Sequence, residues 1–156
     1  MNWIMLIIFI VICEAVGLGG AVFTAKAIPT WYAKLNKPSF SPPNWIFGPV
    51  WTLLYALQGI AAYIIFQYPG GNTAISLFVI QLGLNAFWTP LFFGAKKLGW
   101  AFAEILLMLF FILITVVSFF KIDSGAGWLM LPYAAWVSFA SLLNYKLWRL
   151  NQDKKA

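Results

Sequence analysis

The sequence predicts an all-α membrane protein, a five-transmembrane-helix bundle with its N-terminus outside and its C-terminus in the cytoplasm. The prediction depends on an apolar composition, five long apolar segments and a one-sided distribution of basic residues. Of the 156 residues, 63% are hydrophobic and only 9% are charged, whereas a soluble domain has about 45–50% and about 25%. Because so few charged side chains cannot cover a water-facing surface, the apolar surplus must face lipid or other helices.

Five apolar segments are each close to the roughly 20 residues that cross a bilayer as a helix. They cover about residues 4–24, 45–68, 74–93, 100–120 and 128–150. The first segment has no basic start and is too long for the core of a signal peptide, so we interpret it as a retained helix. The chain is therefore expected to form a single transmembrane domain, residues 1–156.

Prolines and glycines mark the ends of these segments. Pro49 and Pro132 are expected in the opening turns of the second and fifth helices, where a missing N–H costs little. The run Pro69-Gly70-Gly71-Asn72 predicts a turn. Pro90 is expected to kink or end the third helix, and residues 121–125 are expected to form the loop before the fifth.

The basic residues give the direction of the helices. Five crossings place the first loop, the third loop and the C-terminal tail on one side of the membrane. That side has nine basic residues: Lys26, Lys34, Lys37, Lys96, Lys97, Lys146, Arg149, Lys154 and Lys155. Lys121 is alone on the other side. Basic residues concentrate on the cytoplasmic side, so the C-terminus is predicted there, and a four-helix arrangement would destroy this separation.

Several classes of site are disfavoured. The net charge of +6 is scattered between apolar segments, whereas nucleic-acid binding needs a basic, water-exposed face. Cys13 is the only cysteine, so no internal disulfide can form. The chain has no histidine, which removes histidine catalysis and the commonest metal ligand. We therefore expect no metal site.

The loop of residues 27–44 is longer than the roughly two to eight residues that usually connect helices. Pro38, Pro42 and Pro43 stiffen it, and it contains bulky aromatic residues. Long, rigid loops are often functional. We therefore predict that this loop folds over the bundle as a lid, the alternative being a loop that lies among the lipid headgroups.

Three segments each place large aromatic or amide side chains on one helical face. The three faces are Phe47-Trp51-Tyr55, Gln81-Asn85-Trp88 and Tyr133-Trp136-Ala140-Asn144. Amides in hydrocarbon need hydrogen-bond partners, so these faces should point inward. Each face alone is typical of interhelical packing, but together they have the composition of a pocket for a flat, apolar ligand.

Two acidic residues lie within apolar segments. Glu14 is near the middle of the first segment, without a basic residue in the membrane to pair with it. Such a carboxyl is a functional candidate. It is either the proton site of a transporter or a protonated group bonded to a neighbouring helix, and the presence of a single acidic residue favours the second alternative. Glu104 lies one turn inside the fourth segment, within reach of Lys96 or Lys97 at the interface, and we assign it no chemistry.

Three stretches resemble the translocator protein family, also called the TspO or tryptophan-rich sensory protein family, which includes the peripheral-type benzodiazepine receptor. The first is WYxxLxKPSFxPPxWxFGPVWxxLY at residues 31–55. The others are QLxLNxxWxPxFFGA at 81–95 and PYxxWxxFAxxLNY at 132–145. The resemblance covers nearly the whole chain, and the loop motif is very specific.

The resemblance implies a five-helix bundle that binds porphyrins, and in animal members cholesterol and benzodiazepine-type ligands, in a cavity capped by the first loop. It also implies a homodimer and, for some members, light-dependent degradation of protoporphyrin. By similarity, the pocket positions are Trp31, Tyr32, Trp51, Gln81, Asn85, Trp88, Trp136, Ala140 and Asn144. Leu143, Tyr145 and Arg149 additionally fit a loose, weak pattern proposed for sterol contact.

We therefore predict an integral multi-pass protein of the bacterial cell membrane that acts as a receptor or sensor. Its ligand would be a porphyrin (protoporphyrin or haem) or a similar flat apolar molecule, without an obligatory cofactor. One alternative is a light-dependent porphyrin-degrading enzyme that uses Trp51 and Trp136 as redox partners of the ring. The other is a small-molecule transporter that works through Glu14.

Overall fold

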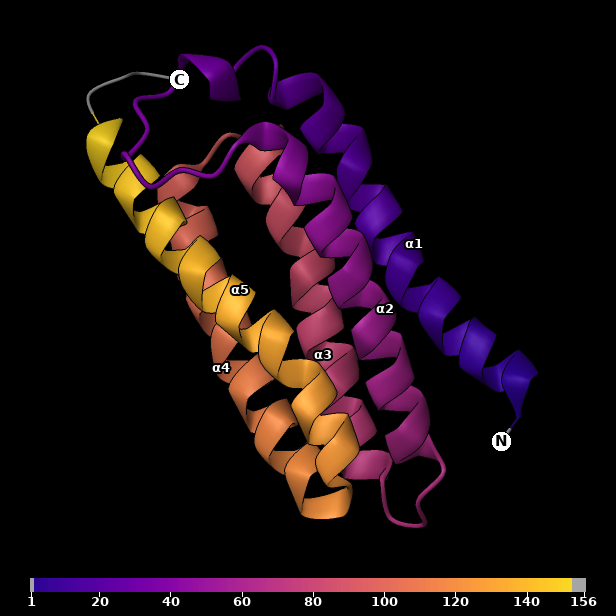
Figure 1. The fold of residues 1–156 in the computed structure, drawn as a ribbon. Coiled ribbons are helices and arrows are strands. Elements are labelled where there is room, and N and C mark those ends of the chain that lie inside the picture. Colours follow the sequence, from indigo (N-terminus) through magenta and orange to yellow (C-terminus); the bar gives the residue numbers. More distant parts are fainter. Residues whose placement is uncertain (1, 153–156) are drawn as a thin grey trace.

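The computed structural model describes residues 2–152, and every regular element in that range is helical. Five long helices follow one another along the chain (Figure 1). They are α1 (Trp3–Ala27), α2 (Phe47–Phe66), α3 (Asn72–Thr89), α4 (Leu98–Ile122) and α5 (Ser124–Leu150). All five are long and apolar enough to cross a bilayer, so the predicted five-helix membrane fold is confirmed.

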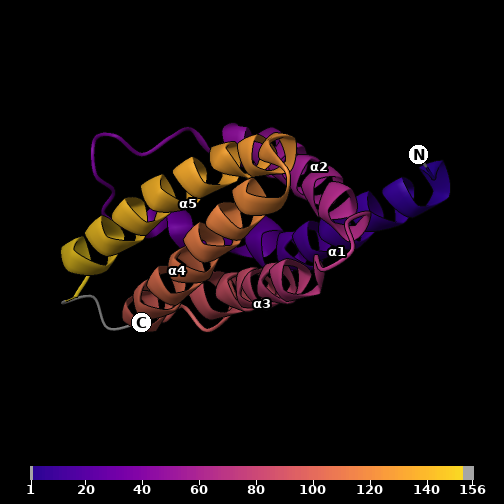
Figure 2. The same cartoon turned by 90° about the horizontal axis from the view of Figure 1, so that it is seen from below.

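The helices form a closed ring. α1 packs against α2 and α3, α2 packs against α5, α5 against α4, and α4 against α3. The view from below in Figure 2 shows α1 between α2 and α3. α1 begins at one end of the bundle and α5 ends at the other (Figure 1), as an odd number of crossings requires. The first loop lies at the end where α5 finishes, which we call the loop end.

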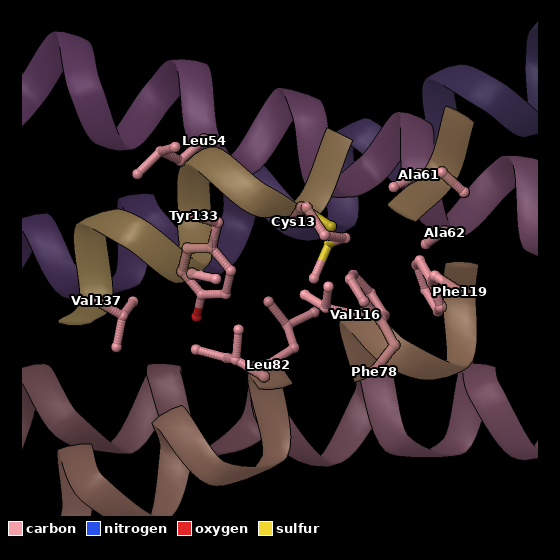
Figure 3. Close-up of a cluster of buried hydrophobic side chains, with 14 of the residues drawn as sticks. Cys13, Leu54, Ala61, Ala62, Phe78, Leu82, Val116, Phe119, Tyr133 and Val137 are labelled. Carbon is pink, nitrogen blue, oxygen red and sulfur yellow. The ribbon is translucent and has the colours of Figure 1, made fainter. Parts of the chain in front are cut away.

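Side chains from all five helices meet in one apolar core (Figure 3). Cys13 comes from α1, Leu54 from α2, Phe78 from α3, Phe119 from α4 and Val137 from α5, and each is at least nine-tenths buried. Large apolar side chains also cover the outside of the bundle. Such a surface is stable only against lipid, which is why the composition and the fold agree.

Close approach of α1 and α2 depends on a glycine. A side chain at Gly59 would place its Cβ 2.6 Å from the Cα of Ile10, inside the backbone of α1. The two helices can therefore cross at this depth only because Gly59 has no side chain. The turn predicted at residues 69–72 is present between α2 and α3, and Gly70 adopts a φ of +90° there.

Two proline predictions have different outcomes. Pro90 ends α3, and the chain continues as a π-helical turn, η3 (Pro90–Gly94), in which the Ala95 N–H donates to the Pro90 carbonyl at 2.8 Å. The prediction that Pro132 occupies an opening turn is wrong, because α5 begins at Ser124 and Pro132 lies inside the helix. Neighbouring helices support such interior prolines in membrane bundles.

The predicted loop at residues 121–125 is also wrong. α4 and α5 are separated by Asp123 alone, whose carboxylate accepts a hydrogen bond from the Ala126 N–H at 2.9 Å and caps α5. A Cβ at Gly127 would collide with the ring of Phe120, so glycine permits this abrupt reversal. Polar and glycine residues that predict a loop here instead start a helix.

Candidate functional site

A cavity of about 260 Å³ opens inside the loop-end half of the bundle. Its walls come from α1, α2, α5, and the end of α3 with η3, and Tyr32 of the first loop also lines it. Eight residues predicted for the ligand pocket line this cavity: Tyr32, Phe47, Trp51, Tyr55, Trp88, Trp136, Ala140 and Asn144. Thus the structure brings together residues separated by more than a hundred positions in the sequence.

The cavity walls are mainly aromatic. On α2, Trp51 stacks on Tyr55 with ring centres 5.5 Å apart. Trp88 stacks on Phe92 at 4.8 Å, and Trp136 of α5 meets Phe47 of α2 edge-on at 6.3 Å. Flat rings held by other rings form a pre-shaped apolar surface. The indole N–H of Trp136 is buried without a hydrogen-bond partner among the described residues.

The cavity opens between α1 and α2. Its lining residues from α3, η3 and α5 are buried or half-buried. Its exposed lining residues belong to α1, to α2 and to the short turn η2 (Asn44–Ile46) that precedes α2: Leu18, Ala21, Asn44, Gly48 and Thr52. Because these helices cross the apolar layer, the opening faces the side of the bundle that contacts lipid.

The other four predicted pocket residues are not part of the cavity lining: Trp31, Gln81, Asn85 and Tyr133. The Tyr55 hydroxyl donates to Asn85 Oδ1 at 2.5 Å, and Asn85 Nδ2 donates to the Tyr133 hydroxyl at 2.7 Å. These bonds join α2, α3 and α5 directly behind the cavity wall. The Asn85 amide and the Tyr133 hydroxyl therefore hold Tyr55 in place through hydrogen bonds between helices. This is the packing role that each face alone predicts.

Gln81 makes a separate contact with α2. Its Nε2 donates to Gln58 Oε1 at 3.1 Å, and both side chains are completely buried. Asn144, in contrast, lies in the cavity wall, where its Oδ1 accepts from the Trp88 indole at 3.2 Å and its Nδ2 donates to the Leu98 carbonyl at 2.9 Å. Asn144 therefore fixes the orientation of one aromatic wall.

The first loop crosses the loop end of the bundle from α1 to α5 (Figure 1). Trp31 and Tyr32, at the start of the helical turn η1 (Tyr32–Lys34), pack against Phe92 and Phe93 of η3. Further along, the Asn36 N–H donates to Asn151 Oδ1 at 2.9 Å, and Asn151 Nδ2 donates to the Asn36 carbonyl at 2.9 Å.

These contacts fasten the loop across the end of the cavity. Lys37 Nζ also lies 4.7 Å from the centre of the Tyr32 ring. Burial of Tyr32 raises the pKa of its hydroxyl, which stays protonated at neutral pH. The loop thus has the geometry expected of a lid.

The two acidic residues within the helices have different surroundings. Glu14 is half-buried and lines the cavity on α1. Glu104 is buried in α4, and neither of its carboxyl oxygens has a hydrogen-bond partner in the described part of the chain. The expected reach of Glu104 to Lys96 or Lys97 is therefore wrong, because burial of its side chain in the bundle directs the carboxyl away from the interface.

The sterol-type pattern is divided between different surfaces. Leu143 is buried and lines the cavity, Tyr145 packs against Phe102 of α4 at 5.3 Å between ring centres, and Arg149 is exposed. A pattern with this spacing on one helix cannot direct all three side chains to one ligand.

The ligand pocket predicted from the sequence includes no residue of α1, although Glu14 was a separate candidate. Gly17, Gly20 and Ala21 line the cavity, and a Cβ at Gly17 would lie 2.5 Å from the Tyr55 ring. Small residues at this spacing are typical of helix packing, and Gly17 has this role here, because its missing side chain lets the Tyr55 ring pack directly against α1. Their small size was the available signal, and its meaning depends on which helix lies opposite.

The fold and the cavity define a class of protein: a multi-pass helical membrane protein with an aromatic cavity beneath its first loop. Residues 9–149 match the model of the TspO/MBR family. The chain is 37% identical to the tryptophan-rich sensory protein of Cereibacter sphaeroides, over 99% of this chain and 96% of that protein. It is 40% identical to the tryptophan-rich protein TspO of Archaeoglobus fulgidus, over 97% and 99% of the two chains.

A further relative is the human translocator protein, which is 41% identical over 78% of this chain and 75% of that protein. The chain therefore belongs to the TspO/MBR family. The resemblance inferred from the loop and helix motifs is confirmed.

Proposed function

We propose that this protein is a membrane receptor or sensor for porphyrins and similar flat apolar ligands, such as sterols or benzodiazepine-type drugs. The observation that carries the proposal is the aromatic cavity, in which Trp51, Trp88 and Trp136 line one space. Indole and phenyl rings stack well on a planar macrocycle. Relatives named as sensory and translocator proteins are compatible with a small-molecule ligand.

The cavity is small and open on one side. Small-molecule pockets usually have about 300–1,000 Å³, and this one has about 260 Å³ with an opening between α1 and α2. A planar ring can slide between the walls while one edge remains in the opening.

A porphyrin titration of the purified protein, followed by absorbance, tests the proposal. Trp136→Ala removes a wall, and Ala140→Leu fills part of the cavity. We expect each to weaken binding by at least about 1 kcal/mol, since an aromatic contact contributes roughly 0.5–1.5 kcal/mol beyond its buried area. Val79→Ala, on the exposed face of α3, is the matched control. Unchanged titrations for both cavity variants, with the fold intact, would place the site elsewhere.

A second candidate function is light-dependent degradation of the bound porphyrin. The observation in its favour is that Trp51 and Trp136 both line the cavity, where each can contact the ring. Illuminated and dark incubations with protoporphyrin, compared by product analysis, separate a binder from an enzyme. A transporter working through Glu14 would instead move ligand into proteoliposomes.

The proposed setting is the bacterial cell membrane, with the protein as a homodimer. Bacterial relatives across nearly the whole chain support the first part. Chemical cross-linking in native membranes tests the second, and a purely monomeric pattern would contradict it.

A further inference from the structure

Glu14 is an unusual member of the cavity wall. Among the described residues that line the cavity, it is the only one with a carboxyl group, and none is basic. Within residues 2–152 its carboxyl has no hydrogen bond or ion pair. The aromatic wall therefore has one strong acceptor that the protein itself leaves unused.

The position of Glu14 makes the carboxyl available to a ligand. It lies on α1 one turn before Gly17 and Leu18, which also line the cavity, and Leu18 is 70% exposed at the opening. Tyr55, whose ring packs directly against α1 at Gly17, already donates its hydroxyl proton to Asn85. Tyr55 is thus not available to satisfy Glu14, and a ligand N–H group would be.

The aromatic rings around Glu14 favour a cationic ligand. A cation placed over an indole face is attracted by the ring quadrupole, most strongly where water is excluded. Trp51 and Trp136 both line this cavity. Carboxylate and indole together are the chemistry that recognises a protonated amine attached to a flat ring.

We propose that this cavity also binds flat aromatic cations, with Glu14 as their counter-ion. The proposal rests on the ligand-binding cavity proposed above and extends its ligand class. The protonated ligand donates an N–H to the Glu14 carboxylate in a charge-assisted hydrogen bond, and no covalent bond changes. A porphyrin carboxylate, by contrast, is repelled at this position and has to lie elsewhere in the cavity.

The test uses two fused-ring probes of the same shape. The full-length protein in nanodiscs of zwitterionic lipid is titrated, at mildly alkaline pH, with 9-aminoacridine, which is a cation, and with acridine, which is neutral. We expect the wild type to bind the cation at least tenfold more tightly, equivalent to about 1.4 kcal/mol. Glu14→Gln should abolish this preference by weakening the binding of the cation.

Glu104→Gln is the matched control, because it removes the other carboxyl within the helices from a position outside the cavity. It should keep the preference for the cation. If Glu14→Gln fails to fold, Leu18→Lys is the second variant, because it places a cation one helical turn from Glu14. It should also abolish the preference.

A preference that persists in Glu14→Gln, or in Leu18→Lys where that variant is used, would overturn the proposal, as would its absence in the wild type. Protoporphyrin binding distinguishes this proposal from the proposed function. Binding of protoporphyrin without a Glu14-dependent preference means that the proposed function stands and this inference fails. Binding of the cation through Glu14 without any protoporphyrin binding means the reverse.

Discussion

Asp123 accepts two hydrogen bonds at the point where the chain reverses direction between α4 and α5. Its carboxylate caps α5 through the Ala126 N–H and accepts a hydrogen bond from the Tyr68 hydroxyl at 2.7 Å. The bond from Tyr68, followed by those from the backbone, lowers the pKa of Asp123 below its ordinary value of 3.8. The ionised form is therefore the one that the fold favours.

This arrangement predicts a pH-dependent effect of Tyr68→Phe. A depressed carboxyl pKa stabilises the fold fully above the unfolded value, and the stabilisation is lost as pH falls through the lower folded value. The variant should therefore unfold more easily than the wild type at neutral pH. The difference should shrink as the pH drops below about 3.8.

Unfolding midpoints in detergent over a pH series measure this effect. Tyr63→Phe is the matched control, because the Tyr63 hydroxyl accepts from the Asn2 N–H and has no carboxylate partner among residues 2–152. Its effect should not vary with pH. A Tyr68→Phe effect that is constant from neutral to acidic pH would contradict the assignment.

Residue-level prediction succeeded where periodicity alone decides which side chains share a face. The spacing of Phe47, Trp51 and Tyr55 predicts one stripe, and all three line the cavity. Spacing cannot say whether an inward face meets a cavity or another helix. Asn85 and Tyr133 have the same inward position, yet their partners are side chains of other helices.

Helix existence was predictable from apolar length, but helix ends were not. The polar run 121–125 and Pro132 have the usual features of a loop and a helix start, whereas α5 begins at Ser124 and continues through the proline. The deciding factors are a cap by Asp123 and the close contact of Gly127 with Phe120, both of which need three-dimensional contacts.

The crossing of α1 and α2 gives a prediction for two glycines. Gly59→Ala places a methyl group against the backbone at Ile10, so the helices must separate, and we expect a loss of about 1–3 kcal/mol in the free energy of unfolding. Gly83→Ala, in α3, meets no atom within 4 Å. It should be neutral or stabilise the protein by up to about 1 kcal/mol, because alanine favours helix.

Reversible unfolding of both variants in mixed micelles measures the difference. Equal effects of the two substitutions would mean that the α1–α2 contact at Gly59 is not close in the membrane. Porphyrin binding is a useful second readout, since α1 also forms one wall of the cavity.

At the scale of the whole molecule, the distribution of charge predicts its direction in the membrane. The first loop and the η3–α4 connection lie at the loop end with the end of α5 (Figure 1), and the basic residues that the structure describes concentrate there. Lys154 and Lys155, which belong to the same predicted side, lie outside the described residues. We expect the loop end to be cytoplasmic.

Reporter fusions measure this orientation. A C-terminal fusion to a reporter that works only in the cytoplasm should be active, and one to a periplasmic reporter should be silent. The opposite pair of results would reverse the assignment. Removing Lys96 and Lys97 together should weaken the bias, because these residues lie in a short loop at the end of a helix, where basic residues determine topology.

The composition of the whole chain also predicts how a porphyrin would be held. Iron in haem proteins is usually fixed by His, Cys, Met or Tyr. This chain has no histidine, and its only cysteine, Cys13, is buried in the apolar core and does not line the cavity. The cavity instead presents indole rings, phenol rings and amides, which stack on the macrocycle and bind its carboxylates.

Binding should therefore depend on the ring and not on the metal. We expect metal-free protoporphyrin to bind at least as tightly as haem, and bound ferric haem to lack the absorption spectrum of thiolate or bis-nitrogenous ligation. Parallel titrations followed by absorption spectroscopy measure both properties. If haem bound tenfold more tightly than the free base, a gap of about 1.4 kcal/mol, and showed a strongly ligated Soret band, iron coordination would be the main interaction and the stacking mechanism would be wrong.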